Sequence, residues 1–113
     1  MKDVGAAGDL EKVWVTRLKE ARLARALSQR KLGIEIGLDP SVASTYVNRY
    51  ELGVHRADYP MSVRLAKALD VPVAYLYCDS DDTAAMLLAY HRAGKSLRRK
   101  AMRVLADQPA TED

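Results

Sequence analysis

The sequence has little of what disulfide-bonded, metal-binding and membrane proteins need. Its 113 residues include one cysteine, Cys78, which cannot form an internal disulfide, so a reducing cytosol is the expected compartment. No apolar run approaches the roughly 18 residues of a membrane span. The first ten residues, MKDVGAAGDL, lack the apolar core of a signal peptide. The 2 histidines lie far from other ligands, so we expect no metal site and no cofactor.

Motifs of catalysis are also missing. The sequence contains no glycine-rich phosphate cradle and no nucleophile motif. The chain is too short to add a catalytic domain to another small domain. We therefore expect a protein that is not an enzyme, with no evident small-molecule ligand.

What is present favours helices. Hydrophobic residues make up 49% of the chain, and leucine, alanine and valine dominate in the complete absence of phenylalanine. Apolar periodicity, caps and glycines predict helices at 11–26, 28–37, 40–51, 60–70, from about 72, from the acidic run DSDD to 93, and at 96–107. We see no strand signal. The predicted fold is all-α, with a disordered tail at 1–10, a five-helix unit at 11–78, a helical hairpin at 79–108 and a tail at 109–113.

Positive charge is placed unevenly along the chain. Residues 1–78 hold 12 basic and 9 acidic side chains, a net charge of +3, whereas residues 79–113 hold 6 of each. This mild bias is compatible with a polyanionic partner but is weak as a signal on its own.

The stretch DPSVASTYVNRYELG, residues 39–53, carries an unusual polar face. At about 100° per residue, one side of a helix holds Ala43, Val47, Tyr50 and Glu51, which we expect to face the core. The other side holds short or forked polar side chains where a solvated helix would more often carry Glu and Lys. These are Ser41, Thr45, Asn48 and Arg49.

The preceding residues complete a pattern of two short helices. Ser28 is a good N-cap for the helix at 28–37, and Gly37 is a suitable C-cap before the tight turn Gly37-Leu38-Asp39. Two short helices joined by a glycine-containing turn form a helix-turn-helix, which presents its second helix to the major groove. Asn can pair with adenine and Arg with guanine, so we predict that the polar face touches base edges.

These segments resemble the phage-repressor or Cro-like helix-turn-helix regulators, also called the XRE family. The resemblance covers about residues 17–77 and rests on RLKEARLARALSQRKLGIEIGLD, NRYELG and RLAKALDVPVAYLY. It implies a five-helix lambda-repressor-like domain that binds double-stranded DNA, usually as a homodimer on a two-fold operator. It also implies that Arg22 pairs with Glu51 inside the domain.

The resemblance further assigns contacts to DNA. Ser44, Thr45 and Arg49 match base-contacting positions, and the helical wheel adds Ser41 and Asn48. Gln29, with Arg30 beside it, is assigned to phosphate, as are His55 and Arg56 in the loop after the third helix. One departure is that 14 residues separate Gly37 from Glu51, about one helical turn more than the common pattern. The recognition helix is therefore predicted to be extended, with Ser41 and Val42 on the extra turn.

Several alternatives stay open. The leading function is a transcriptional repressor that acts in the cytoplasm of bacteria or on phage DNA, associated with the nucleoid. The second is an antitoxin that binds a toxin partner and represses its own promoter, and a third is a protein-interaction module that no longer binds DNA. The hairpin is either a dimerisation element or a cover for its own domain. Tyr46 is expected to pack, Cys78 to be an ordinary thiol, and residues 98–100 to form a solvated face.

Overall fold

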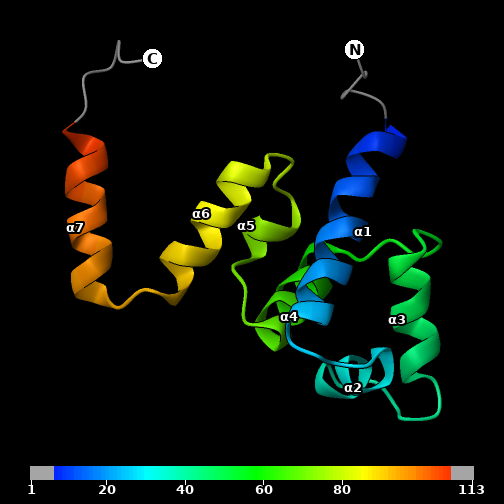
Figure 1. Cartoon of the computed structure of the whole chain (residues 1–113). Coiled ribbons are helices and arrows are strands. Elements are labelled where there is room, and N and C mark those ends of the chain that lie inside the picture. The colour runs from blue at the N-terminus through cyan, green and yellow to red at the C-terminus, as the bar shows by residue number, and fades with distance from the viewer. Residues whose placement is uncertain (1–6, 108–113) are drawn as a thin grey trace.

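Seven helices make up residues 7–107, the part of the chain that this computed structural model describes (Figure 1). They are α1 (Ala7–Ala24), α2 (Gln29–Glu35), α3 (Ala43–Glu51), α4 (Tyr59–Leu69), α5 (Val73–Leu76), α6 (Asp81–Arg92) and α7 (Lys95–Ala106). Among the described residues there is no strand, so the all-α prediction is confirmed. The tails expected at 1–6 and 109–113 lie outside the described residues, while 7–10, predicted as tail, are helical.

Local side-chain chemistry sets the ends of α2. Ser28 is its N-cap, as predicted, and its hydroxyl oxygen accepts a hydrogen bond from the backbone N–H of Lys31 at 3.0 Å. This bond satisfies an N–H that the first helical turn leaves without a partner. Gly37 follows the helix with a φ of +94°, in the left-handed region that glycine enters without steric cost.

The predicted extra turn at the start of the third helix is wrong. The helix was expected from residue 40, but α3 begins at Ala43, and residues 40–42 form a turn. The carboxylate of Asp39 explains the difference, because it accepts from both the backbone N–H of Ser41, at 2.8 Å, and its hydroxyl, at 2.6 Å. Short polar side chains of this kind compete with helical hydrogen bonding, so Asp39 closes a turn instead of capping a helix at Pro40.

One hydrophobic core unites α1 to α5. Each of these helices contributes at least one fully buried side chain, and the apolar ones larger than alanine are Leu18, Leu32, Val47, Leu65, Leu69 and Leu76. Burying a leucine or valine in this way contributes about 1.5–3 kcal/mol to the free energy of folding. The same core covers the inner side of α3, where Ala43, Val47, Tyr50 and Glu51 are all buried as predicted.

The helices α2 and α3 approach closely at Gly33. A Cβ atom built on Gly33 would lie 2.6 Å from the Cβ of Ala43 and 2.7 Å from its carbonyl oxygen. Real Cβ atoms do not come this close to backbone, so the crossing of the two helices requires glycine at this position.

A buried ion pair joins α1 to the last residue of α3. Arg22 Nε lies 2.5 Å from Glu51 Oε2, and Arg22 Nη2 donates to Glu51 Oε1 at 3.0 Å, so the pair is bidentate. The remaining nitrogen, Nη1, donates to the carbonyl oxygen of Leu27 at 2.9 Å. Both charged residues are only 8% exposed. The structure thus brings together the two residues that the family resemblance pairs.

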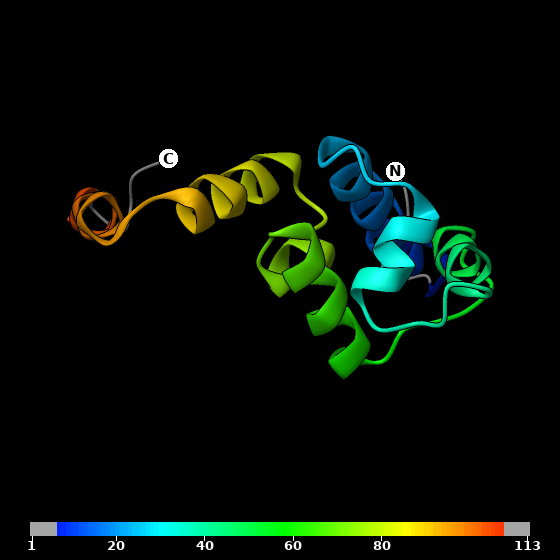
Figure 2. The same cartoon turned by 90° about the horizontal axis from the view of Figure 1, so that it is seen from below.

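The chain leaves the core after the start of α6, where Ala84 is still buried in it (Figures 1 and 2). The start of α6 is fastened by Arg17, which donates to Asp81 Oδ1 at 3.0 Å and to the carbonyl oxygen of Cys78 at 2.8 Å. The radius of gyration of 16.3 Å exceeds the about 13 Å of a compact chain of this length, as expected if the last helices extend outwards.

The predicted C-terminal hairpin is present as two consecutive helices, but it is open. In Figures 1 and 2, α6 and α7 diverge from the turn that joins them. The periodicity of residues 96–107 predicts that Leu97, Val104 and Leu105 face inward. This prediction is wrong for the chain by itself, because Leu97 is 59% exposed and Val104 and Leu105 are 58% exposed. The helix is amphipathic, with Leu97 and Leu105 on an apolar side that is largely exposed.

Replacing Gly33 with alanine should destabilise the fold. We expect the free energy of unfolding to fall by about 1–3 kcal/mol, because the new Cβ forces α2 away from α3 and this outweighs the better helix propensity of alanine. Urea denaturation of the purified variant measures the change. Gly94→Ala is the control: nothing lies within 4 Å of its added Cβ, and a change below about 0.5 kcal/mol is expected. Equal stability of the two variants would contradict the close approach.

Removing one partner of the buried ion pair should cost far more than removing a surface pair. We expect Glu51→Ala to lower the free energy of unfolding by about 3–5 kcal/mol, because Arg22 is left buried without its counter-charge. Glu35→Ala, which breaks an exposed contact of 3.8 Å with Arg25, should cost about 0–1 kcal/mol.

The double variant Arg22→Met/Glu51→Leu separates charge from packing. It should be more stable than Glu51→Ala, because apolar side chains of similar volume often replace a buried ion pair at little cost. Denaturation curves for the three proteins test this order, and a double variant less stable than Glu51→Ala would refute it.

Candidate nucleic-acid interface

The outer side of α3 is a solvent-exposed row of polar side chains. Ser44, Thr45, Asn48 and Arg49 are all exposed, on the side of the helix opposite its buried residues. The helix itself lies at the edge of the five-helix unit, beside α2 (Figures 1 and 2). The row therefore combines hydroxyl, amide and guanidinium groups on a rigid, accessible helix.

Ser41 stands apart from this row. It lies in the turn before α3, and its hydroxyl is engaged by Asp39 Oδ1 at 2.6 Å. Hydrogen bonds from the side chain and then the backbone of Ser41 hold the pKa of Asp39 below its ordinary value. Asp39 therefore stays ionised at neutral pH, and its charge lies next to the start of the exposed row.

A hydrogen-bonded network connects α2 to the exposed face of α3. Gln29 Nε2 donates to Asn48 Oδ1 at 3.2 Å and to Glu51 Oε1 at 3.1 Å. Through Glu51 the network reaches Arg22. Because the oxygen of Asn48 faces Gln29, its NH₂ group is left as a donor, and the second lone pair of the oxygen is still an acceptor.

The same network limits how Gln29, which the family resemblance assigns to a DNA phosphate, can contact that phosphate. Both protons of its amide nitrogen are used by Asn48 and Glu51, so the side chain has only its oxygen left, which cannot donate to phosphate. Its backbone N–H, at the first turn of α2, is among the donors that a helix start leaves without an intrahelical partner. Arg30 follows it in the sequence and is exposed.

The loop after α3 carries two side chains with different partners. The ring of His55 stacks on Tyr46, with centroids 6.1 Å apart and an interplanar angle of 27°, and is 6.4 Å from the ring of Tyr50. This contact agrees with the packing role predicted for Tyr46. Arg56 instead forms an ion pair with Glu11 on α1. That partner could not be inferred from the sequence, because 45 residues separate the two.

Other residues singled out in the sequence take structural roles. His91 Nε2 lies 3.1 Å from Asp70 Oδ1, which links α6 to the end of α4. Cys78 is half-buried. Arg98 donates to the carbonyl oxygens of Tyr90 and His91 at the end of α6, at 2.7 Å and 2.6 Å, so it is not part of a purely solvated face.

Two features are absent from residues 7–107, the described part of the chain. No group of three histidine, cysteine, aspartate or glutamate side chains within them is placed to hold a metal ion. None of their helices is both long enough and apolar enough to cross a membrane.

Comparisons with known proteins agree with this geometry. The family model HTH_3, described as Helix-turn-helix, matches residues 18–76. No curated protein sequence matches the chain. A solved structure titled "Crystal structure of transcriptional regulator BswR" is 34% identical, with a TM-score of 0.81, and the match covers 88% of this chain and 98% of that one. The chain belongs to the XRE-type helix-turn-helix family of DNA-binding transcriptional regulators.

Proposed function

We propose that this protein is a sequence-specific transcriptional repressor that binds a two-fold operator as a homodimer, with α3 in the major groove. The observation that carries the proposal is the exposed row on α3, held in place by Glu51 at one end and by the contact of Gly33 with Ala43 at the other. A dimer on its operator would repress by blocking access of the polymerase to the promoter.

In this proposal, four side chains of α3 read base edges. Arg49 pairs with the O6 and N7 atoms of guanine, and Asn48 pairs with adenine in the orientation that Gln29 imposes. Thr45 and Ser44 donate to base edges, and the methyl group of Thr45 meets a thymine methyl. Ser41, which lies in the turn before the helix, reaches DNA only after its hydroxyl leaves Asp39.

Phosphate contacts fix the position of α3. Gln29 contributes its backbone N–H, Arg30 its exposed charge, and His55 a ring that stacks on Tyr46. Arg56 reaches phosphate only by leaving Glu11. Such contacts orient a protein on the duplex without reading its sequence.

Dimerisation through α7 is the second part of the proposal. A helix of 12 residues is marginal in water when no partner covers its apolar face. The exposed side chains Leu97 and Leu105 form such a face, and Met86 and Tyr90 on α6 are exposed as well. Residues 1–76 are fewer than 88% of the chain, so the match to the BswR structure extends into the C-terminal helices. A C-terminal extension shared with another transcriptional regulator supports a functional role for α6 and α7, such as dimerisation.

Two arginine variants should separate base reading from phosphate binding. On a duplex with the preferred sequence, we expect Arg49→Ala to cost about 1–3 kcal/mol of binding free energy and to relax specificity at one position in each half-site. Arg30→Ala should weaken binding to all duplexes alike and reduce the slope of log K against log salt by about 1. Fluorescence anisotropy at several salt concentrations measures both. Equal, sequence-independent losses for the two variants would contradict the assignment.

Charges placed on α7 should abolish the dimer. We expect the wild type to be a dimer in sedimentation equilibrium and Leu97→Lys/Leu105→Lys to be a monomer with weaker binding to the full operator, because two buried lysines per subunit would face each other. Leu23→Lys is the matched control, since Leu23 on α1 is 58% exposed, like Leu105. A monomeric wild type would contradict the proposal and favour a partner of another kind, as in the antitoxin alternative.

A further inference from the structure

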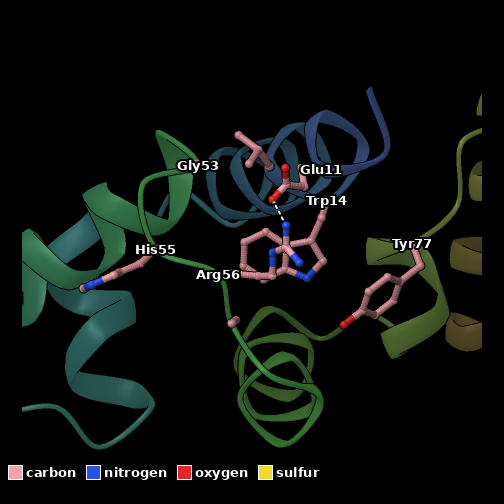
Figure 3. A pocket seen from close by; sticks show the side chains of 8 residues that line it. Glu11, Trp14, Gly53, His55, Arg56 and Tyr77 are labelled. Carbon is pink, nitrogen blue, oxygen red and sulfur yellow. Dashed lines mark hydrogen bonds and ion pairs between the residues drawn. The ribbon is translucent and has the colours of Figure 1, made fainter. Parts of the chain in front are cut away.

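A pocket of about 300 Å³ lies beside the loop that follows α3 (Figure 3). It is built from three segments that are far apart in the sequence. The first turns of α1 contribute Glu11, Trp14 and Val15, the loop contributes residues 53 and 55–57, and Tyr77 follows α5. Its volume is at the lower end of those that hold small molecules, and its wall is mostly apolar and aromatic.

The floor of the pocket offers ring surfaces and few free polar groups. The indole N–H of Trp14 donates to Ser62 Oγ at 3.1 Å, and the hydroxyl of Tyr77 donates to the same oxygen at 2.8 Å. Among the described residues, no buried side-chain nitrogen or oxygen lacks a partner. The polar atoms of this floor already bond to one another, so a polar ligand group would gain little there in return for its lost water, and we expect the buried part of a ligand to be apolar.

Charge is confined to the mouth of the pocket. Arg56 forms its ion pair there with Glu11, and the side chains are 75% and 45% exposed. The pair uses Nη2 of Arg56, and the other guanidinium nitrogens have no recorded partner among the described residues. A guanidinium group presents a fork of donors that matches a carboxylate. The net charge of +3 on residues 1–78 also favours the approach of an anion over that of a cation.

We propose that this pocket binds a small aromatic carboxylate, whose ring lies against Trp14 and Tyr77 and whose carboxylate binds Arg56. Glu11 competes with the ligand for Arg56 and repels its negative charge. Arg56 therefore decides which ligands bind, and Glu11 limits how tightly they bind.

The position of the pocket couples this ligand to DNA, and this step rests on the proposed function. Figure 3 shows Arg56 extending towards Glu11 while the ring of His55, the preceding residue, points away from Arg56 and Trp14. Arg56 can bind either a ligand carboxylate or a DNA phosphate. A bound carboxylate also adds negative charge next to the loop, so the ligand should act as an inducer that weakens DNA binding.

The sequence contains 1 tryptophan, so the indole N–H resonance of Trp14 reports on the pocket without ambiguity. The probe is phenylacetate, added to the full-length protein without DNA, with benzylamine and phenylacetamide as charge controls. We expect phenylacetate to shift this resonance with a Kd of about 1 mM or tighter, the range for a ligand of this size. The two controls should bind at least about tenfold more weakly, because neither offers Arg56 a carboxylate.

Variants of Arg56 and Glu11, at the mouth of the pocket, test whether the carboxylate of the ligand binds Arg56. Arg56→Gln should weaken phenylacetate binding by about tenfold or more, whereas Glu11→Gln should tighten it severalfold. Lys12→Gln removes an exposed charge next to Glu11 but outside the pocket, and should leave the affinity within about twofold. No indole shift at 10 mM probe, on the order of ten times the expected Kd, would overturn the proposal. Equal binding of benzylamine, or an unchanged affinity in Arg56→Gln, would overturn it as well.

The effect on DNA is measured separately. Saturating phenylacetate should weaken the binding of a preferred duplex by about threefold to tenfold and have no effect on the Arg56→Gln variant. If phenylacetate binds and the affinity for DNA stays constant, the inducer role is refuted. If the protein binds phenylacetate but selects no DNA sequence, the proposed function fails and the pocket stands.

Discussion

The ion pair between Arg22 and Glu51 holds the end of α3 against α1, and the position of the exposed row on α3 depends on it. A buried ion pair adds little to stability compared with apolar side chains of the same volume, since both charges lose their hydration. Its directional hydrogen bonds, however, allow only one arrangement. Gln29 binds the same carboxylate and Asn48, so hydrogen bonds connect the ion pair to a side chain on the exposed side of α3.

The helix is rigid, whereas the loop after it has partners that can be exchanged. At Gly33 the backbone of α2 packs directly against Ala43 of α3, which restricts how the two helices can move relative to each other. In the loop, Arg56 is bound by an exposed carboxylate on α1, and such surface ion pairs are weak enough for a phosphate or another anion to replace them. In the proposed function and the proposed ligand site, the reading of bases and the response to a ligand therefore belong to neighbouring but physically different parts of one small unit.

The sequence predicts what depends on local chemistry and on periodicity. Ser28 and Gly37 delimit α2 as caps should, and the wheel separates the buried from the exposed side of α3. The start of α3 was predicted wrongly, because Asp39 satisfies Ser41 in a turn instead of capping a helix. Contacts between distant segments, such as Glu11 with Arg56, leave no local signal. The spacing of apolar residues in α7 predicts that one side of the helix is apolar, but it does not indicate what covers that side.

The central claim is that α3 reads base sequence as part of a symmetric dimer. Selection of bound duplexes from a random pool by the purified wild-type protein, at low and at moderate salt, tests it most directly. The account predicts a two-fold symmetric motif that persists at the higher salt, with half-sites on one face of the duplex about one helical turn apart. Unselective binding that is lost steeply as salt rises would contradict it, since charge alone would then account for the affinity.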